Sequence, residues 1–179
     1  HEYGHSFGLK AREALEESRE VVARNIGAKP EEVIFTSGGA ESNNLAIKGT
    51  SLANKDKQHL ITSKIEHTSV LNVIRSLSGL GFRSSYLNVD EEGFIDLEQL
   101  KSEINEETLL ISVQHANQEI GTIQDIKKVG RICEERGALF HVDAVQSFTK
   151  VPIDVRELNI DLLSISAHKI HGPKGIGAL

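Results

Sequence analysis

The spacing of apolar and polar residues predicts five helices along the chain. In the first of them, Leu15, Val22 and Ile26 recur at helical spacing with charged residues between them, a pattern typical of an amphipathic helix. Glycine, which commonly ends a helix, follows the first segment at Gly27 and the last at Gly137. Helices are therefore expected over residues 8–26, 40–48, 66–80, 97–104 and 125–136.

Short apolar runs lie between these segments and predict strands. They cover residues 32–36, 59–63, 82–89, 109–113, 138–142 and 161–166. Strands and helices alternate over the whole length, which favours a three-layer α/β sandwich built on a mainly parallel sheet. No internal repeat and no Pro-, Gly- or Ser-rich linker interrupts the pattern, so residues 1–179 are expected to form one continuous domain.

The composition narrows the possible functions. A hydrophobic fraction of 39% is enough for a sizeable core, and a net charge of −6 argues against a nucleic-acid partner, which needs a clustered basic face. No apolar run approaches the roughly 20 residues that span a bilayer. The single cysteine excludes an intrachain disulfide, so a cytoplasmic location is expected.

The ends of the chain indicate a piece of a longer protein. The chain starts at His1, contains no methionine and stops at Gly177–Leu179, in what is expected to be the beginning of a buried strand. We therefore expect a domain that is incomplete at both ends.

Ligands of parallel α/β proteins bind beyond the carboxyl ends of strands, so the residues that follow each predicted strand are candidates for chemistry. Residues 36–44, Thr-Ser-Gly-Gly-Ala-Glu-Ser-Asn-Asn, form a Gly-rich turn that leads into a helix. Free N–H groups and the positive helix end make such a turn a phosphate-binding site, and the alternative is a plain capped turn. The chain lacks the patterns of a Walker loop and of a dinucleotide fingerprint at this place.

Two further strand ends carry an acid and a base. Asp143 closes the apolar run 138–142, so its carboxylate is expected to be partly buried and to need a partner such as a protonated pyridine nitrogen. A helix N-cap is the alternative. Lys169 follows the strand 161–166, and partial burial would prepare its amine for Schiff-base chemistry, with Ser166 and His168 binding an anion beside it. A solvated surface lysine is the alternative.

Two other places carry a weaker signal. Residues 115–121 follow the strand 109–113 with several polar side chains, which point into a crevice or simply form a turn. His67 follows the strand 59–63, where its ring either stacks on a planar cofactor or begins a helix.

Five stretches, taken in this order, resemble cysteine desulfurases, within the class V aminotransferase group of fold-type I enzymes that use pyridoxal 5'-phosphate (PLP). The stretches are residues 36–44, 66–67, 115–121, 141–146 and 166–169. The resemblance covers essentially the whole chain. It implies the PLP-binding large domain of fold type I over residues 1–179, without the C-terminal small domain.

The resemblance implies a role for each candidate residue. Lys169 corresponds to the Schiff-base lysine, and His67 to the catalytic-site residue that stacks on the ring. Asp143 would pair with the pyridine nitrogen, Gln146 would bind the phenolic oxygen, and Asn117 would lie near the ring and the substrate carboxylate. The phosphate would be held by Gly39, Ala40, Ser166 and His168. No metal ligand is implied.

The chain departs from the family pattern in three places. Ala40 stands where many members have threonine, which removes one hydroxyl contact to the phosphate, and Gln118 stands where asparagine is common. The family's reactive cysteine lies in the part beyond Leu179. Cys133, within the segment 125–136, is expected to be a packing residue. The small domain and a phosphate contact from a second subunit also lie outside the chain.

The resemblance implies a PLP-dependent cysteine desulfurase, a sulfurtransferase that converts L-cysteine to L-alanine and an enzyme persulfide. The sulfur would serve iron–sulfur cluster or thio-cofactor synthesis through a scaffold or other acceptor protein, and the enzyme would be a cytoplasmic homodimer. Two alternatives stay open: a selenocysteine or sulfinate lyase of the same group, and a non-catalytic fragment that binds PLP or a protein partner. No nucleic-acid or membrane partner is expected.

Overall fold

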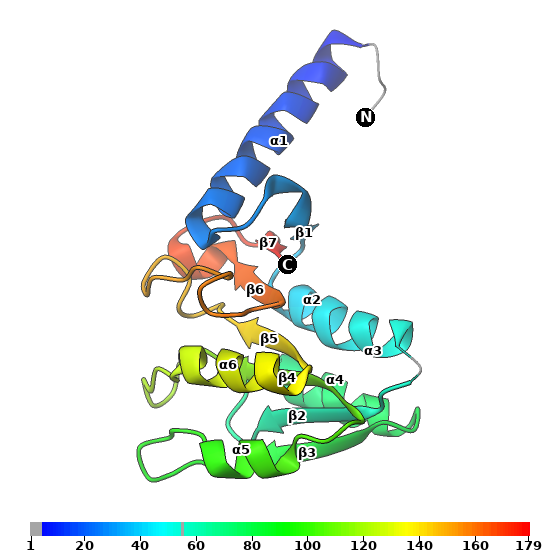
Figure 1. Ribbon diagram of the computed structural model, residues 1–179. Helices are drawn as coiled ribbons and strands as arrows, with labels where there is room; N and C mark the ends of the chain where they lie inside the picture. Colours follow the sequence, from blue (N-terminus) through cyan, green and yellow to red (C-terminus); the bar gives the residue numbers. More distant parts are fainter. Residues whose placement is uncertain (1–4, 55) are drawn as a thin grey trace.

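A computed structural model describes residues 5–54 and 56–179 of the chain. Seven strands in this part form one sheet with the order β1-β7-β6-β5-β4-β2-β3 (Figure 1). Neighbouring strands from β6 to β3 run parallel, and β7 runs antiparallel to both β6 and β1. The mainly parallel sheet confirms the prediction. The strands are β1 (Phe35–Thr36), β2 (His59–Ser63), β3 (Arg83–Leu87), β4 (Thr108–Gln114), β5 (Leu139–Asp143), β6 (Leu162–Ser166) and β7 (Gly177–Ala178).

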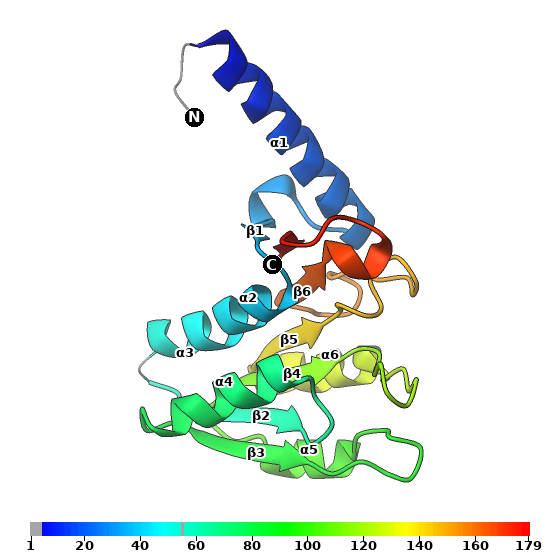
Figure 2. The ribbon, with the colours of Figure 1, turned by 180° about the vertical axis from the view of Figure 1, so that it is seen from behind.

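Helices cover both faces of the sheet (Figures 1 and 2), which confirms the three-layer α/β sandwich. One face carries α5 (Leu97–Glu103) and α6 (Ile126–Arg136), and the other carries α2 (Gly39–Asn44), α3 (Thr50–Ala53) and α4 (Thr68–Ser78). The long helix α1 (Ser6–Ile26) buries Ala23 and Ile26 near its end, while its beginning extends away from the sheet. None of the helices within the described residues has the length and apolar character that crossing a membrane requires.

The register of the parallel strands builds one hydrophobic core on each face. Ile61, Ile111 and Phe140 are successive partners across β2, β4 and β5, and they belong to the core beneath α5 and α6. Leu60 and Leu110, one position earlier on their strands, belong instead to the core beneath α4. Each of these side chains is at most 1% exposed, and full burial of such a residue contributes about 1.5–3 kcal/mol.

Two segments differ from the sequence-based expectation. A strand is predicted over residues 32–36, but Pro30–Glu32 form a 3₁₀ turn (η1) and the strand β1 has only two residues. Proline suits the first position of such a turn, because its ring fixes φ and its missing N–H needs no partner there. The helix predicted over residues 40–48 continues instead through the π-helical segment Leu45–Gly49 (η2) into α3.

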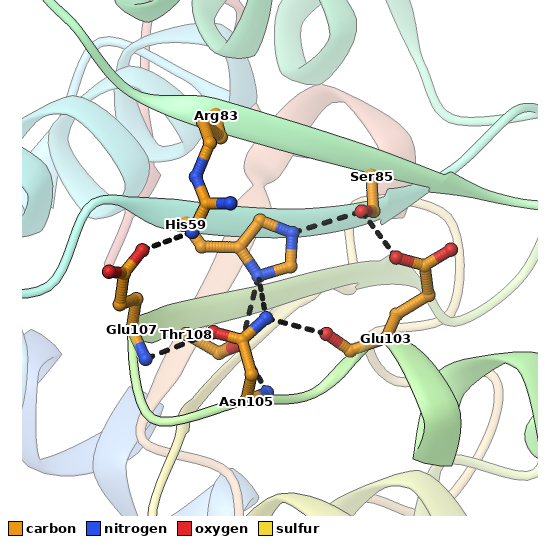
Figure 3. A network of polar contacts seen from close by, with 7 residues as sticks. All are labelled: His59, Arg83, Ser85, Glu103, Asn105, Glu107 and Thr108. Atoms are coloured by element: carbon orange, nitrogen blue, oxygen red, sulfur yellow. Dashed lines mark hydrogen bonds and ion pairs between the residues drawn. The ribbon is translucent and has the colours of Figure 1, made fainter.

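A polar network joins the amino-terminal ends of β2, β3 and β4, opposite to the strand ends that carry the candidate residues (Figure 3). His59 is 4% exposed, and its Nδ1 and Nε2 each lie 2.9 Å from a hydroxyl oxygen, of Thr108 and Ser85 respectively. The Ser85 hydroxyl donates to Glu103 Oε2 at 2.7 Å. Because its single hydrogen is used there, Ser85 accepts from the ring, and His59 is protonated at Nε2.

Candidate functional site

A cavity of about 580 Å³ opens beyond the carboxyl ends of β4, β5 and β6. This is the place where parallel α/β sheets bind ligands. Eight of the nine predicted site residues line it, and they come from segments as far apart in sequence as residues 39 and 169. They are Gly39, Ala40, His67, Asp143, Gln146, Ser166, His168 and Lys169.

Asp143 is the buried acid of this cavity. It ends β5, is 2% exposed, and accepts hydrogen bonds from Val145 N at Oδ1 (3.0 Å) and from Asn43 Nδ2 at Oδ2 (2.8 Å). Burial raises the pKa of Asp143, against the lowering effect of these two hydrogen bonds and of the nearby His67. These bonds orient both oxygens, and none of the described residues forms an ion pair with Asp143 within 4 Å. The carboxylate is therefore suited to a positively charged ligand group.

The segment after Asp143 forms hydrogen-bonded turns rather than the helix start that the N-cap alternative requires. Ser147 N and Phe148 N both donate to Ala144 O, at 3.1 and 2.8 Å, and the chain then turns again at Lys150. The bond from Val145 N to Asp143 caps the first of these turns. Gln146 reaches the cavity from the same turn and is half-buried.

Lys169 lies in the 3₁₀ turn Ala167–Ile170 (η3) at the wall of the cavity, where its side chain is exposed. The expected partial burial is therefore wrong, because the chain leaves the sheet at Ser166 and enters η3 at the surface. Ser166 itself is 1% exposed, and its Oγ lies 2.8 Å from Nδ1 of His168. The three residues thus present a hydroxyl, an imidazole and an amine from one short turn, a combination that suits an anion.

The Gly-rich turn brings its backbone against the turn that follows Asp143. A Cβ on Gly39 would lie 2.5 Å from Cγ2 of Val145, so only glycine fits there without displacing the neighbour. In the first helical turn the N–H groups of Gly39 and Ala40 have no intrahelical acceptor. A hydrogen bond from the Ser42 hydroxyl to Ala178 O, at 3.0 Å, anchors the turn to β7. Gly39 and Ala40 both line the cavity, so their backbone donors lie beside the space that a ligand would occupy.

His67 begins a helix, as one of its two interpretations predicts, and it also lines the cavity. It is the N-cap residue of α4, and its Nδ1 accepts a hydrogen bond from Ser69 N at 3.1 Å. Its side chain is also exposed and lines the cavity. Capping therefore fixes the ring at the cavity wall, and its stacking on a cofactor stays a prediction.

Asn117 is the predicted site residue that the structure places outside the cavity wall. Its Oδ1 accepts from the backbone N–H groups of Glu119 and Ile120, at 2.9 and 3.2 Å, and its Nδ2 donates to Ile65 O at 2.9 Å. These contacts make it a residue that shapes its loop and ties it to the segment before His67. Its neighbour Gln118 lines the cavity instead.

Two buried residues of the site were not assigned a role from the sequence. Asn43 is 1% exposed and donates through Nδ2 to Asp143 and to Ser69 Oγ. Glu66 is 6% exposed and lies on the same cavity wall. The sequence does contain a signal that Asn43 is buried. Asn43 stands four positions before the apolar Ile47, and residues at this spacing lie on the same face of a helix.

Cys133 is a packing residue, as the sequence predicts. It is 1% exposed within α6, and burial, with a smaller effect of the Asp161 charge, raises the pKa of its thiol to about 12. A larger and more apolar cavity of about 750 Å³ adjoins it at the amino ends of β5 and β6. Since none of the nine predicted site residues lines that cavity, we assign the site to the smaller one.

Residues 1–179 match the aminotransferase class-V family. Cysteine desulfurase IscS of Dictyoglomus turgidum is 54% identical over 176 residues, which are 98% of this chain and 45% of that protein. Cysteine desulfurase IscS of Rickettsia felis is 55% identical over 181 residues, which are 100% of this chain and 44% of that protein. The chain thus spans less than half the length of these relatives.

Solved structures show the same fold. SspA in complex with cysteine superposes with a TM-score of 0.95 at 46% sequence identity, covering 98% of this chain and 51% of that one. DndA from Streptomyces lividans superposes with a TM-score of 0.90 at 39% identity, covering 99% of this chain and 50% of that one.

Proposed function

Because this chain belongs to the aminotransferase class-V family, we propose that it forms the PLP-binding core of a cysteine desulfurase. The whole enzyme converts L-cysteine to L-alanine and a persulfide on one of its own cysteines. The observation that carries the proposal is one cavity that brings together a buried carboxylate (Asp143), a lysine (Lys169) and a Gly-rich turn with free N–H groups. Support also comes from the relatives named cysteine desulfurase and from a neighbouring structure in complex with cysteine.

The residues of the cavity fit PLP in charge and in shape. The cofactor has a ring nitrogen that accepts a proton, a doubly charged phosphate and a flat aromatic ring. Asp143 is a buried acid that has no ion-pair partner within 4 Å among the described residues, and Gly39, Ala40, Ser166 and His168 offer donors for the phosphate. His67 presents its ring at the cavity wall, and Gln146 lines the cavity beyond Asp143.

In the reaction, each residue acts through its position and charge. When bound, PLP supplies an electron sink for the negative charge that develops at the substrate α-carbon. Asp143 holds the ring-nitrogen proton by its negative charge, and Asn43 and Val145 N keep the carboxylate in that orientation. Lys169, exposed at the cavity wall, is the base that moves the α-proton by way of Nζ.

Sulfur transfer needs a thiolate that can reach the substrate. Cys133 does not meet this need, because it is buried and its thiol has a pKa of about 12. We therefore assign the nucleophilic cysteine to a part of the protein outside residues 1–179. Residues 1–179 are then the large domain of a two-domain enzyme.

We further propose that the enzyme is a cytoplasmic homodimer that passes sulfur to an iron–sulfur scaffold or another acceptor protein. The support is the similarity over the whole chain to relatives named IscS.

The test uses the whole protein loaded with PLP. Alanine and sulfide release from L-cysteine is expected in the wild type, together with loss of both products in Lys169→Ala. Parallel assays with L-selenocysteine and L-cysteine sulfinate distinguish a lyase of the same group. Faster turnover of either of these than of L-cysteine, or full activity in Lys169→Ala, would contradict the proposal.

A further inference from the structure

Glu66 is a buried carboxyl group that the proposed mechanism does not use. It is 6% exposed, and the Ser63 hydroxyl donates to its Oε1 at 2.5 Å. The Ser63 oxygen also accepts from Ile65 N at 3.3 Å. Within the described residues, Oε2 of Glu66 has no hydrogen-bond partner. A buried carboxylate with one oxygen unsatisfied is costly, so the protonation state of Glu66 has to be decided.

The charges that face Glu66 come from several elements. The titratable groups that line the cavity with it are Asp143 at the end of β5, His67 at the start of α4, Glu119 of the loop after β4, and His168 and Lys169 of η3. Among the described residues, none forms an ion pair with Glu66 within 4 Å. The group that raises the energy of its charged form is the other buried acid, Asp143.

Hydrogen bonding decides which of the two acids carries the charge. Asp143 accepts one good hydrogen bond at each oxygen, from Val145 N and from Asn43 Nδ2, and such bonds favour the ionised form. Glu66 accepts a side-chain hydrogen bond from Ser63 at Oε1, with a smaller effect of the Gln114 backbone, and its Oε2 has no partner among the described residues. Two buried carboxylates that line one cavity do not both ionise readily. The negative charge therefore belongs on Asp143 and the proton on Glu66.

We propose that Glu66 is a positioning residue held as a neutral carboxylic acid, with its proton on Oε2, so that Asp143 is the single negative charge beside the cofactor ring nitrogen. The role toward the cofactor rests on the proposed function. An acid proton turns the unpartnered Oε2 into a hydrogen-bond donor. Asn43 presents an unpartnered acceptor, Oδ1, in the same cavity.

Burial raises the pKa of Glu66 to about 8, and the charge of Asp143 adds to this effect against hydrogen bonding to Ser63 and the Gln114 backbone. The acid is thus neutral at pH 7 and ionises in mildly alkaline solution. Loss of its proton puts a second buried negative charge, beside that of Asp143, at the cavity wall, where it repels the phosphate-bearing cofactor. Cofactor affinity is therefore expected to fall as pH rises through about 8.

An infrared titration of the whole protein without PLP tests the protonation state directly. The wild type should show the carbonyl stretch of a protonated carboxylic acid, lost with a midpoint near pH 8 and absent from Glu66→Gln. In Asp143→Asn the midpoint should fall by roughly one unit, because a neighbouring like charge is gone. Glu135→Gln, at an exposed position, is the control and should keep the band. Titration of Glu66 near the ordinary glutamate value of about 4.3 would overturn the proposal.

PLP binding tests the role toward the cofactor. Glutamine imitates the neutral acid, so at pH 7 the dissociation constant of Glu66→Gln should lie within about threefold of the wild-type value. Above pH 8 the wild type should lose affinity more steeply than the variant. A tenfold change at pH 7 would show that Glu66 is charged in the resting site and would refute the proposal.

The two measurements separate the two hypotheses. If neither wild type nor variant binds PLP, the proposed function fails, and with it the role of Glu66 toward the cofactor, whereas the infrared titration still decides whether the acid is neutral. If Glu66→Gln does not fold, the wild-type and Asp143→Asn titrations carry the test by themselves.

Discussion

Each side chain of the site owes its chemistry to its immediate surroundings. Asp143 is buried with both oxygens hydrogen-bonded, whereas Lys169 stands exposed in the turn after β6. The acid is therefore fixed in place, while the amine is free to approach a ligand and to withdraw from it. This division suits a site in which one group holds a proton and another moves one.

Lys169 is expected to be the lysine that PLP modifies. It is the lysine that lines the cavity within the described residues, and it stands beside the anion-binding candidates Ser166 and His168. Borohydride reduction of the PLP-treated protein, followed by peptide mapping, should locate the label on Lys169. A label spread over Lys174 and the surface lysines would contradict this assignment.

Asp143→Asn is expected to preserve PLP binding and to reduce turnover of the whole enzyme by at least about a hundredfold, the usual cost of removing one electrostatic stabiliser. Asparagine keeps the shape and the bond to Val145 N but carries no charge to hold the ring-nitrogen proton. Steady-state alanine release measures the effect. Asp56→Asn, at an exposed position, is the control, and equal turnover in Asp143→Asn and the control would refute the role.

The junctions between strands and the following turns position the site more than the strands themselves do. Asp143, Ser166 and Gly39 all stand where the chain leaves the sheet or enters a helix. The turn at Gly39 packs directly on the turn at Val145. A shift of the turn proposed to bind the phosphate would therefore also displace the turn that follows Asp143.

Gly39→Ala is expected to weaken PLP binding by about tenfold, since overpacking of this kind costs about 1–3 kcal/mol. The added Cβ would lie 2.5 Å from Val145 Cγ2 and push the two turns apart. Val145→Ala in the same chain should restore much of the affinity, as measured by absorbance titration with PLP. Gly79→Ala, whose Cβ would make an ordinary 3.5 Å contact with Ser76 O, should bind normally. If the double variant did not regain PLP affinity, the contact between Gly39 and Val145 would not be the cause of the loss.

The polar network around His59 predicts that the free energy of unfolding depends on pH. Burial lowers the pKa of His59, with a further contribution from Arg83, so the unfolded chain binds the proton more readily. The stabilisation is fully present above the unfolded pKa of about 6.5 and is lost as pH falls through the lower folded value, by up to about 1.4 kcal/mol per pH unit.

His59→Gln should therefore flatten part of the decline in unfolding free energy between about pH 7 and pH 5. Urea denaturation at several pH values measures this slope. His141, whose pKa burial lowers to about 3, contributes with the same sign and remains in the variant, so the decline is reduced rather than abolished. His5→Gln, at an exposed position, should retain the wild-type slope, and an unchanged slope in His59→Gln would count against the network.

The molecule as a whole has a cavity suited to the proposed cofactor, but its single thiol cannot act there. Cys133 lies in α6, on the face of the sheet opposite to α2 and α4. Residues 1–179 alone are therefore expected to release no sulfide from L-cysteine, although weak PLP binding and slow transamination are expected. Catalytic sulfide release that disappears in Cys133→Ala would refute this placement of the nucleophile.

The sequence by itself determined the order of the elements and the set of candidate residues. Strands 59–63, 109–113 and 138–142 are found within one or two residues of their predicted bounds, because a strand buried on two faces requires a short apolar run, which is a local signal. The five stretches indicated the family because their residues, taken in order, resemble it, and each stretch lies at the end of a strand or the start of a helix. In a parallel sheet such positions meet at one edge, so eight of nine candidates share one cavity.

Only the tertiary structure decided which distant residues are in contact and how strongly burial affects each ionisable group. Asn43 reaches Asp143 across 100 positions, and β7 inserts between β1 and β6, pairings that no local pattern encodes. Asn117 proved to shape its loop, and Lys169 to be exposed. The protonation of Glu66 follows from burial beside a second acid. A sequence shows which groups can ionise, but only their packing sets the free energy of each charge.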